Sequence, residues 1–277
     1  MPDIIMTIES AYPFLTTTEQ RIADYVLAHR TEVQFMSISE LAAECGVVES
    51  TVTKFCRRLS LKGYAAFKLA IAKATTENWQ DLSGAEDGVA ALCKRVCVED
   101  TAAISESLAL LDSDSVTRAV DLLTGAERIY CMGQGASSII ANEAAHLFYS
   151  VMPQCFFVQG SHTQVGRVSL FSEKDVLLFF CYSGATTVVV YLLELARSRG
   201  ARTILITRHA NSPAADHADV VLQCGSNESP LSPGSIPARL AQLYVVDVLY
   251  NAFIERRPAQ SAENLERIAN ALTEMHL

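Results

Sequence analysis

The spacing of hydrophobic and polar residues changes part-way along the chain. In the first 75 residues, apolar positions recur three or four apart, as at Ile22, Tyr25 and Val26, which is the rhythm of an amphipathic helix. From Arg128 onward, apolar runs of three to six residues alternate with longer stretches of helical spacing. The pattern predicts an all-helical N-terminal domain followed by a domain of alternating strands and helices.

Two signals mark where helices begin in the N-terminal part. The sets Thr16-x-x-Glu19 and Ser37-x-x-Glu40 both have the spacing of a capping box, in which a hydroxyl and a carboxylate satisfy backbone N–H groups reciprocally. They predict a helix that ends near Arg30 and a short helix over residues 38–44. Gly46 ends the short helix, because glycine tolerates the positive φ that a helix C-terminus often requires.

The residues around this glycine have the pattern of a helix-turn-helix motif, which joins two short helices by a tight turn. The second helix is expected over residues 49–59. Val52, Phe55 and Leu59 fall on one face of it and predict its buried side. The opposite face is small, polar and basic, as in a helix that reads a DNA groove. A helical docking domain without DNA contact is the alternative.

The charge distribution favours DNA contact by this end of the chain. Although the net charge is −9, the segment 54–73 holds six bases and no acid. Residues 1–75 are neutral, with eight bases and eight acids, so the 14 bases and 23 acids of the remaining chain account for the negative charge. A basic block on an acidic body is expected where only one end meets phosphate. The alternative is an ordinary solvated helix face.

The polar residues of this region suit different parts of a DNA duplex. Short hydroxyl side chains near a helix N-terminus reach base edges, whereas point charges suit phosphates. The candidate DNA-binding residues are Ser50, Thr51 and Thr53 for bases, and Lys54, Arg57, Arg58, Lys62 and Lys68 for phosphates. Tyr64 has two interpretations, packing beside the DNA backbone or in the protein core.

The same stretch resembles a known family. Residues 16–73, above all the turn glycine and the stretches 51–59 (TVTKFCRRL) and 62–68 (KGYAAFK), are similar to the N-terminal domain of the RpiR family of bacterial regulators. The chain departs from the family at Val48, where Ser is common, and at Ser60, where Gly is usual. Loss of a Ser N-cap weakens a helix by about 1 kcal/mol. Both departures bear on the operator sequence more than on DNA binding itself.

A polar segment separates the two parts of the chain. Residues 76–88 contain two glycines and no clear period, which is typical of a linker. The predicted boundaries are therefore 1–75 for the helix-turn-helix domain, 76–88 for the linker and 89–277 for the second domain, which begins with a helix over 89–111. Trp79 either docks on a neighbouring domain or subunit or is incidental.

The eight cysteines indicate no metal or redox site. No CxxC pair occurs, so neither a zinc knuckle nor a thioredoxin-like site is indicated. Cys93 and Cys97 lie one helical turn apart and suit a metal, but no His or third Cys lies near them in the sequence, so we expect them to pack in a core. We expect reduced, mostly buried thiols.

The second domain is expected to be α/β, with a doubly wound parallel sheet of flavodoxin-like type. The expected strands are 129–132, 155–158, 176–181, 203–206 and 220–222, and the expected helices are 137–151, 186–199, 213–217, 237–254 and 262–275. In such sheets, ligands bind beyond the carboxyl ends of the strands, where the strand order reverses. A strand order of 2-1-3-4-5 places the loops after the first and third strands together.

These two loops contain groups that suit phosphate. Glycines let backbone N–H groups approach an anion, and hydroxyls at a helix N-terminus add donors. The candidate ligand-binding residues are Gly133, Gly135, Ser137 and Ser138 in the first loop, and Ser183, Gly184, Thr186 and Thr187 in the second. Hydroxyl groups without metal-binding carboxylates suit a phosphate monoester. The alternative is that both loops are only tight turns.

Two other phosphate-binding motifs do not fit. A dinucleotide site needs a third glycine where this chain has Ser138, and an acid after the second strand, which ends Val158-Gln159-Gly160. A P-loop needs a lysine that follows the glycine loop, and neither loop has one. The sequence therefore favours a site without a cofactor.

A second resemblance covers residues 128–255, which are similar to the SIS (sugar isomerase) domain. It implies that the two loops hold the phosphate of a phosphosugar. The similarity includes the loop hydroxyls and the stretch 239–243 (RLAQL), whereas Cys181 and Ala238 replace serines that are common in the family. The segment around His162 is similar to a family segment that often begins with an acid, so His162 is the candidate sugar-facing residue. The order of the two modules is that of RpiR regulators.

The two resemblances together predict a transcriptional regulator of sugar metabolism without catalytic residues, cofactor or metal. Its expected partners are double-stranded operator DNA, a phosphosugar effector such as an amino-sugar or pentose phosphate, and further copies of itself in a homodimer or homotetramer. The alternative is a phosphosugar isomerase with an N-terminal assembly module, whose general base would come from Glu143, His146, His162 or Glu228.

The chain is expected to be cytoplasmic and to have no membrane partner. Its longest apolar run, 176–182, has seven residues, far short of the roughly 18 that a spanning helix needs. No Lys or Arg precedes Arg21, whereas a secretory signal begins with a basic region.

Overall fold

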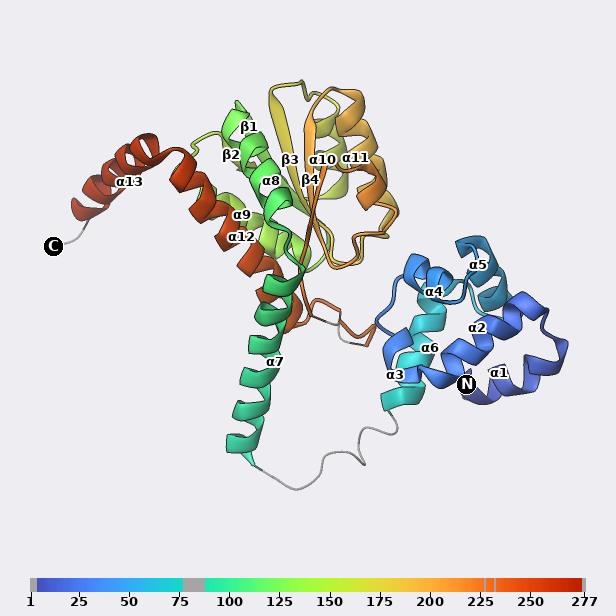
Figure 1. Cartoon of the computed structure of the whole chain (residues 1–277). Coiled ribbons are helices and arrows are strands. Elements are labelled where there is room, and N and C mark those ends of the chain that lie inside the picture. The colour runs from blue at the N-terminus through green and yellow to red at the C-terminus, as the bar shows by residue number, and fades with distance from the viewer. Residues whose placement is uncertain (1–3, 77–87, 227, 232, 276–277) are drawn as a thin grey trace. The chain divides into compact units, whose positions relative to one another are not determined.

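A computed structural model describes residues 4–76, 88–226, 228–231 and 233–275 of the chain (Figure 1). The chain divides into two compact units. The first comprises Met1–Val98 with Asn227–Pro233, and the second comprises Glu99–Ser226 with Gly234–Leu277. Most of the predicted linker, including Trp79, lies outside the described residues.

The first unit consists of short helices. They are α1 (Ile4–Ala11), α2 (Thr17–Ala28), α3 (Arg30–Val33), α4 (Ile38–Glu44), α5 (Glu49–Arg58) and α6 (Tyr64–Thr76), with a 3-10 turn, η1 (Tyr12–Phe14). Both predicted capping boxes are confirmed, at the N-termini of α2 and α4. The sequence pattern does not predict α1, α3 or α6.

One apolar core holds these helices together. Leu41, Val52, Phe55 and Phe67 are fully buried, and the rings of Phe55 and Phe67 meet edge to face at 5.8 Å. Leu59 belongs to the same cluster. The predicted buried face of residues 49–59 is therefore confirmed.

The second unit contains a five-stranded parallel sheet. Its strands are β1 (Arg128–Gly133), β2 (Cys155–Phe157), β3 (Asp175–Phe180), β4 (Arg202–Thr207) and β5 (Val220–Gln223). They lie in the order β2-β1-β3-β4-β5, which confirms the predicted fold class and strand order. All six residues of β3 are buried, as expected for a central parallel strand with helices on both faces.

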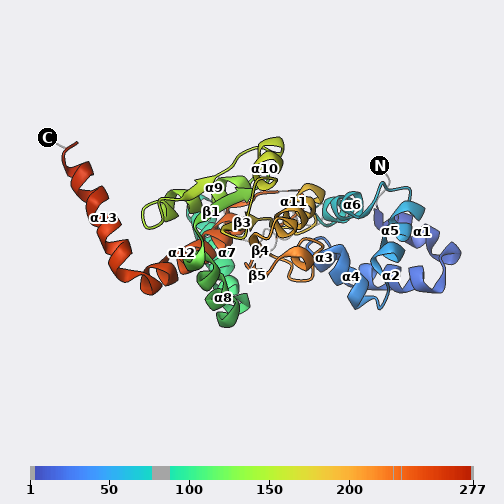
Figure 2. The ribbon, with the colours of Figure 1, turned by 90° about the horizontal axis from the view of Figure 1, so that it is seen from above.

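Helices cover both faces of this sheet (Figure 2). The helices from α7 onward are α7 (Val89–Leu110), α8 (Ser113–Gly125), α9 (Ser137–Phe148), α10 (Ser161–Val168), α11 (Thr187–Ser198), α12 (Ile236–Arg256) and α13 (Pro258–Thr273). Of these, α13 extends away from the sheet (Figure 1). One apolar layer joins the sheet to α8, α9 and α12, and another joins it to α10 and α11. None of the described helices has the length and apolarity needed to cross a membrane.

The predicted helix over residues 213–217 is wrong, because only a 3-10 turn, η2 (Ala215–His217), forms there. The backbone is held on both sides of this turn. Ala214 N–H donates to the Gly184 carbonyl at 2.9 Å, and Asp219 N–H donates to the Thr203 carbonyl at 3.1 Å. These two bonds leave room for a single turn before β5 begins.

The expectation that Cys93 and Cys97 pack in a core is also wrong, since both side chains are exposed. Their helix, α7, is present nearly as predicted, but its buried residues are Ala103 and Ser107, in its second half. Helical spacing of apolar residues predicts the helix but does not say whether the same chain covers its apolar face. The other six cysteines are buried, as expected.

Candidate functional site

The predicted DNA-reading residues come together on the outer face of α5. Ser50, Lys54 and Arg57 are exposed, and Thr51 and Thr53 are half-buried, while the opposite face fills the core. Lys62 is exposed in the loop that follows. The helix therefore presents hydroxyls in its first turns and bases toward its C-terminal end.

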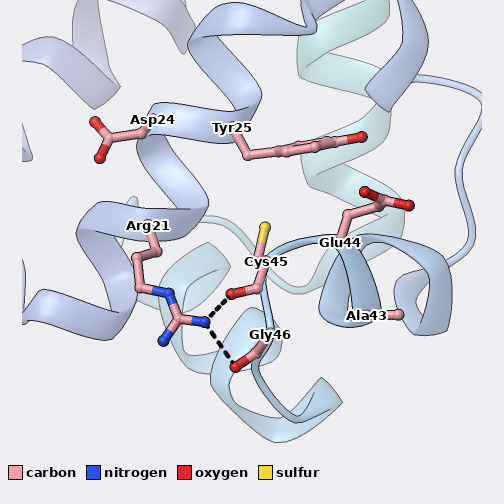
Figure 3. A pocket seen from close by; sticks show the side chains of 7 residues that line it. All are labelled: Arg21, Asp24, Tyr25, Ala43, Glu44, Cys45 and Gly46. Carbon is pink, nitrogen blue, oxygen red and sulfur yellow. Dashed lines mark hydrogen bonds between the residues drawn. The ribbon is translucent and has the colours of Figure 1, made fainter.

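The turn that precedes α5 is anchored by Arg21 of α2 (Figure 3). The guanidinium donates to the carbonyl oxygens of Cys45 and Gly46, the latter at 2.9 Å. Gly46 has φ +59°, the left-handed conformation predicted for the residue that ends the short helix. Beside these bonds lies an open cavity of about 450 Å³, lined also by Asp24 and Tyr25. A charged donor on two carbonyls fixes the angle between α4 and α5.

The first turn of α5 has no side-chain cap, because Val48 occupies the N-cap position. The weaker N-cap expected from Val48, at a position where the family commonly has Ser, is therefore confirmed. Ser39 of α4 donates to the Glu49 carboxylate instead. The backbone N–H groups at this helix start are therefore left without a protein side chain as acceptor.

Arg58 has a structural partner inside the unit. It donates to Glu19 at 2.9 Å and to the Phe14 carbonyl at 2.6 Å. Burial alone would raise the pKa of Glu19, but hydrogen bonds from Thr16 and the nearby Arg58 outweigh burial and hold this pKa below its ordinary value. Arg58 thus ties the C-terminal end of α5 to the start of α2 while remaining exposed, as its neighbour Arg57 is.

Lys68 and Tyr64 lie on α6 rather than on α5. Lys68 is half-buried, and burial lowers the pKa of its ammonium group to about 8 despite the opposing effect of Glu40 and Glu228. The Tyr64 hydroxyl donates to the carbonyls of Met36 and Ser37 at 3.1 and 3.3 Å. Of the two interpretations of Tyr64, the structure therefore supports packing within the protein.

In the second unit, the two predicted phosphate loops begin at neighbouring positions of the sheet. Gly133, the last residue of β1, is the register partner of Phe180, the last residue of β3. Since both strands run in the same direction, the loops leave the same edge of the sheet side by side.

The first loop, residues 133–138, is packed closely. A side chain at Gly133 would lie 2.5 Å from the Ser137 carbonyl oxygen, so glycine is required at this position. Ser137 is largely buried, and its hydroxyl accepts a hydrogen bond from Gln242 of α12 at 3.3 Å. Ser138, next along, is half-buried, and Gly135 is exposed.

An amide network supports this loop from the side of α10. Gln134 donates to the Gln164 side chain at 2.6 Å, and Gln164 donates in turn to the carbonyls of Gly133 and Val158 at 3.2 and 2.9 Å. Sequence reasoning did not assign these glutamines, although a polar residue at an inward-facing helical position is a usable signal. His162, the candidate sugar-facing residue, is exposed in the first turn of the same helix.

The second loop, residues 183–187, exposes more of its hydroxyl groups. Ser183 and Thr187 are exposed, and Thr186 is half-buried. Gly184 has φ +59°, and a side chain there would collide with Ser212. Cys181 donates weakly to the Thr186 hydroxyl at 3.8 Å, so it packs beneath the loop.

The helices that follow these loops begin without side-chain caps. The N-cap residues of α9 and α11, Ala136 and Thr186, make no side-chain capping bond. The N-caps of α2, α4, α8 and α12 do make one, whereas those of α3, α5, α10 and α13 also do not. Uncapped first turns point backbone N–H groups and the positive end of the helix dipole at the loop edge, which favours an anion.

Comparisons with known proteins match both units. Residues 3–78 fit the family model described as "Helix-turn-helix domain, rpiR family", and residues 122–252 fit the SIS domain model. An HTH-type transcriptional regulator of Caldanaerobacter subterraneus is 30% identical over 276 residues, covering 99% of this chain and 98% of that protein. The regulator HexR of Escherichia coli is 30% identical over 275 residues, covering 98% and 95%.

The chain belongs to the RpiR family of transcriptional regulators. Vibrio vulnificus NanR, solved in complex with ManNAc-6P, has the same fold, with a TM-score of 0.89 and 24% identity over 99% of this chain and all of that one. The sugar isomerase domain of an RpiR transcription factor from Sphaerobacter thermophilus covers 65% of this chain, and 98% of its own length, with a TM-score of 0.58 and 22% identity. The family resemblance predicted from the sequence is confirmed.

Proposed function

We propose that this RpiR regulator binds a phosphosugar at the 133–138 and 183–187 loops and that binding changes its affinity for operator DNA. The observation that carries the proposal is the pairing of two hydroxyl-rich turns at one edge of the sheet, each leading into an uncapped helix. Backbone N–H and hydroxyl donors at helix N-termini suit a phosphate monoester. NanR, which shares the fold, was solved with the amino-sugar phosphate ManNAc-6P, and we extend this class of ligand to the present chain.

The DNA contacts are proposed for α5 and the loop after it. Ser50, Thr51 and Thr53 face base edges, and Lys54, Arg57 and Lys62 face phosphates. Arg58 and Lys68 add positive charge from positions where they also hold the unit together. Recognition helices of this type read palindromic sites as pairs, so two copies of the chain are needed.

Self-association is proposed through the C-terminal helices. Leu265 and Leu272 of α13 are exposed and fall on one face of this helix. Apolar side chains at helical spacing favour burial against another helix, here that of a second copy. Sedimentation equilibrium tests this: Leu265→Glu with Leu272→Glu should yield a smaller species, and an unchanged mass would exclude this interface.

A hydrogen-bonded network supports a route from the second loop to α7. Tyr182, next to Ser183, donates to the Ser226 carbonyl at 2.7 Å, and Arg208 donates to the same oxygen at 3.0 Å. Arg208 also donates to Glu106 of α7 at 2.9 Å, and Ser226 N–H donates to Glu106 at 2.8 Å. Since α7 continues toward the DNA-binding unit along the chain, a shift of the loop on ligand binding would reach it through these bonds. Such coupling requires that the ligand prefer one state of the network.

The same geometry favours a sensor over an isomerase. Of the candidate bases, Glu143 and His146 lie on α9 six and nine residues beyond Ser137, about 9 and 14 Å along a helix axis. Glu228 belongs to the other unit. His162 lies on α10, whose Gln164 is hydrogen-bonded to the first loop. Turnover of a phosphosugar by the purified chain would favour the isomerase.

Thermal unfolding tests the proposed function. The full chain should unfold at higher temperature with at least one of a panel of hexose, pentose and amino-sugar phosphates, because a ligand that prefers the native state stabilises it. The matching free sugars should have little effect, and Ser183→Ala should reduce the shift. Equal stabilisation by a sugar and its phosphate would remove the reason for placing a phosphate at these loops.

A further inference from the structure

Arg239 lies in the first turns of α12, next to the first phosphate loop. Three residues later on the same helix, Gln242 is bonded to Ser137. Just before the helix, Gly234 lies so close to Ala136 that a side chain at position 234 would collide with it. Residues three apart share a helix face, and side chains lean toward the helix N-terminus. Arg239 is therefore placed between two contacts with the 133–138 loop.

One N–H donor of the Arg239 side chain has no hydrogen-bond acceptor among the described residues. This donor is the Nε, which is buried. An arginine keeps its charge at any pH at which proteins fold. The residue as a whole is half-buried, so the cost falls on this donor: a buried donor without an acceptor destabilises a protein. In native proteins an ordered water, an ion or a ligand commonly completes such a group.

The two loops lack the charge that such a partner would need. Residues 133–138 and 183–187 contain no Lys, Arg, Asp or Glu. Neutral donors hold an anion by geometry, but a doubly charged monoester moved out of water also needs a positive charge beside it. Arg208 also lies at this edge, but its guanidinium is bonded to Glu106 and to the Ser226 carbonyl. Arg239 is a second cation placed here, and its planar fork matches phosphate oxygens.

We propose that Arg239 donates to the phosphate of the bound phosphosugar and supplies the positive charge that the loops lack. This inference rests on the proposed phosphosugar site and adds one residue to it. It explains why the ligand-free chain keeps a buried guanidinium N–H without an acceptor. It also predicts that removal of the charge lowers the affinity for the ligand without lowering the stability of the ligand-free chain.

The test compares the intact chain with Arg239→Met, Arg239→Lys and Arg256→Met. Arg256 lies on the same helix, is exposed and pairs with Asp121 at 2.9 Å, so its replacement is a matched loss of charge away from the loops. Inorganic phosphate is titrated at constant ionic strength, and the unfolding temperature is recorded. Arg239→Met should weaken phosphate binding by about tenfold or more, Arg239→Lys should weaken it less, and Arg256→Met should leave it unchanged.

The ligand-free samples complete the test. Arg239→Met without phosphate should unfold at the same temperature as the intact chain or higher. Unchanged phosphate binding in Arg239→Met would overturn the assignment, and so would a lower unfolding temperature without ligand, because that would reveal an internal partner. If the intact chain binds neither phosphate nor any phosphosugar, both the proposed phosphosugar site and the role of Arg239 are wrong. If the intact chain binds phosphate and Arg239→Met binds it equally well, only the role of Arg239 is wrong.

Discussion

Under the function proposed above, the two units of this chain would bind phosphate by opposite means. In the first, the basic residues Lys54, Arg57 and Lys62 stand exposed on and after one helix, with no acid between them. In the second, the loops carry no charged residue, and their donors are backbone N–H groups and hydroxyls fixed by close packing. Exposed charges act over distance and are screened by salt, whereas fixed neutral donors act at contact.

The difference between the two units matches the ligand proposed for each of them. A DNA backbone is a repeating line of single negative charges, and flexible Lys and Arg side chains neutralise it without precise positioning. A phosphosugar carries one compact dianion, and a small pocket recognises it by geometry. DNA binding by this chain should therefore weaken steeply with salt, and phosphosugar binding should weaken much less.

The largest effect is expected from removal of two exposed bases of α5. Lys54→Ala with Arg57→Ala should lower affinity for a duplex selected from genomic fragments by roughly a hundredfold and reduce the salt slope by about two. Fluorescence anisotropy at several salt concentrations measures both. Lys174→Ala with Arg256→Ala removes the same charge from the second unit and serves as the control. An unchanged slope in the α5 variant would contradict phosphate contact there.

The next effect is expected in the second loop. Gly184→Ala forces a side chain into a left-handed backbone position and against Ser212, a strain of about 1–3 kcal/mol. Phosphosugar affinity should fall by roughly tenfold or more, with DNA binding retained. Calorimetric titration measures this. Gly200→Ala, also at positive φ (82°) but away from the loops, should spare the ligand, and equal losses in both variants would show a general effect on stability.

A smaller effect is expected where the two sites communicate. Glu106→Gln weakens the bonds from Arg208 and Ser226 to α7. The ligand-induced change in DNA affinity should shrink by about fivefold, while the affinity for ligand alone changes little. Anisotropy with and without phosphosugar gives the coupling. Glu99→Gln on the same helix is the control, and an intact coupling in Glu106→Gln would exclude this route.

The smallest effect is expected at Glu19, which forms an ion pair with Arg58 within the first unit. Because the pKa of Glu19 is lowered in the folded chain, its carboxylate stabilises the fold above its unfolded pKa of about 4.3, and this stabilisation is lost as pH falls through the folded value. Glu19→Gln should be less stable by about 1 kcal/mol at pH 7, and the gap should narrow as pH falls below the unfolded value. Denaturation at neutral pH and below the unfolded value measures it. A gap independent of pH would show that ionisation of Glu19 is not involved.

Local chemistry that repeats a known pattern was predictable from the sequence. The capping boxes at Thr16 and Ser37 and the glycine turn follow from spacing and turn residues. The order of the strands was assumed from the flavodoxin-like fold class and agrees with the structure. The two loops could be named because strand order brings them together. Helices such as α10, with Gly166 and few inward apolar residues, give too weak a pattern to predict.

Other features depend on contacts between distant segments. The bond of Arg58 to Glu19 spans 39 positions, and that of Gln242 to Ser137 spans 105. No local pattern shows that Arg58, and not its equally exposed neighbour Arg57, pairs with Glu19. The unmet donor of Arg239 likewise becomes visible only when all its neighbours are placed.

One titration tests the central claim most directly. A phosphosugar that raises the unfolding temperature is added to the complex of the full chain with its selected duplex, and DNA affinity is followed for the intact chain and for Ser183→Ala. The account predicts that the phosphosugar changes DNA affinity in the intact chain, that the free sugar does not, and that Ser183→Ala needs about tenfold more ligand for the same change. The same response to the free sugar, or an unaltered response in Ser183→Ala, would contradict it.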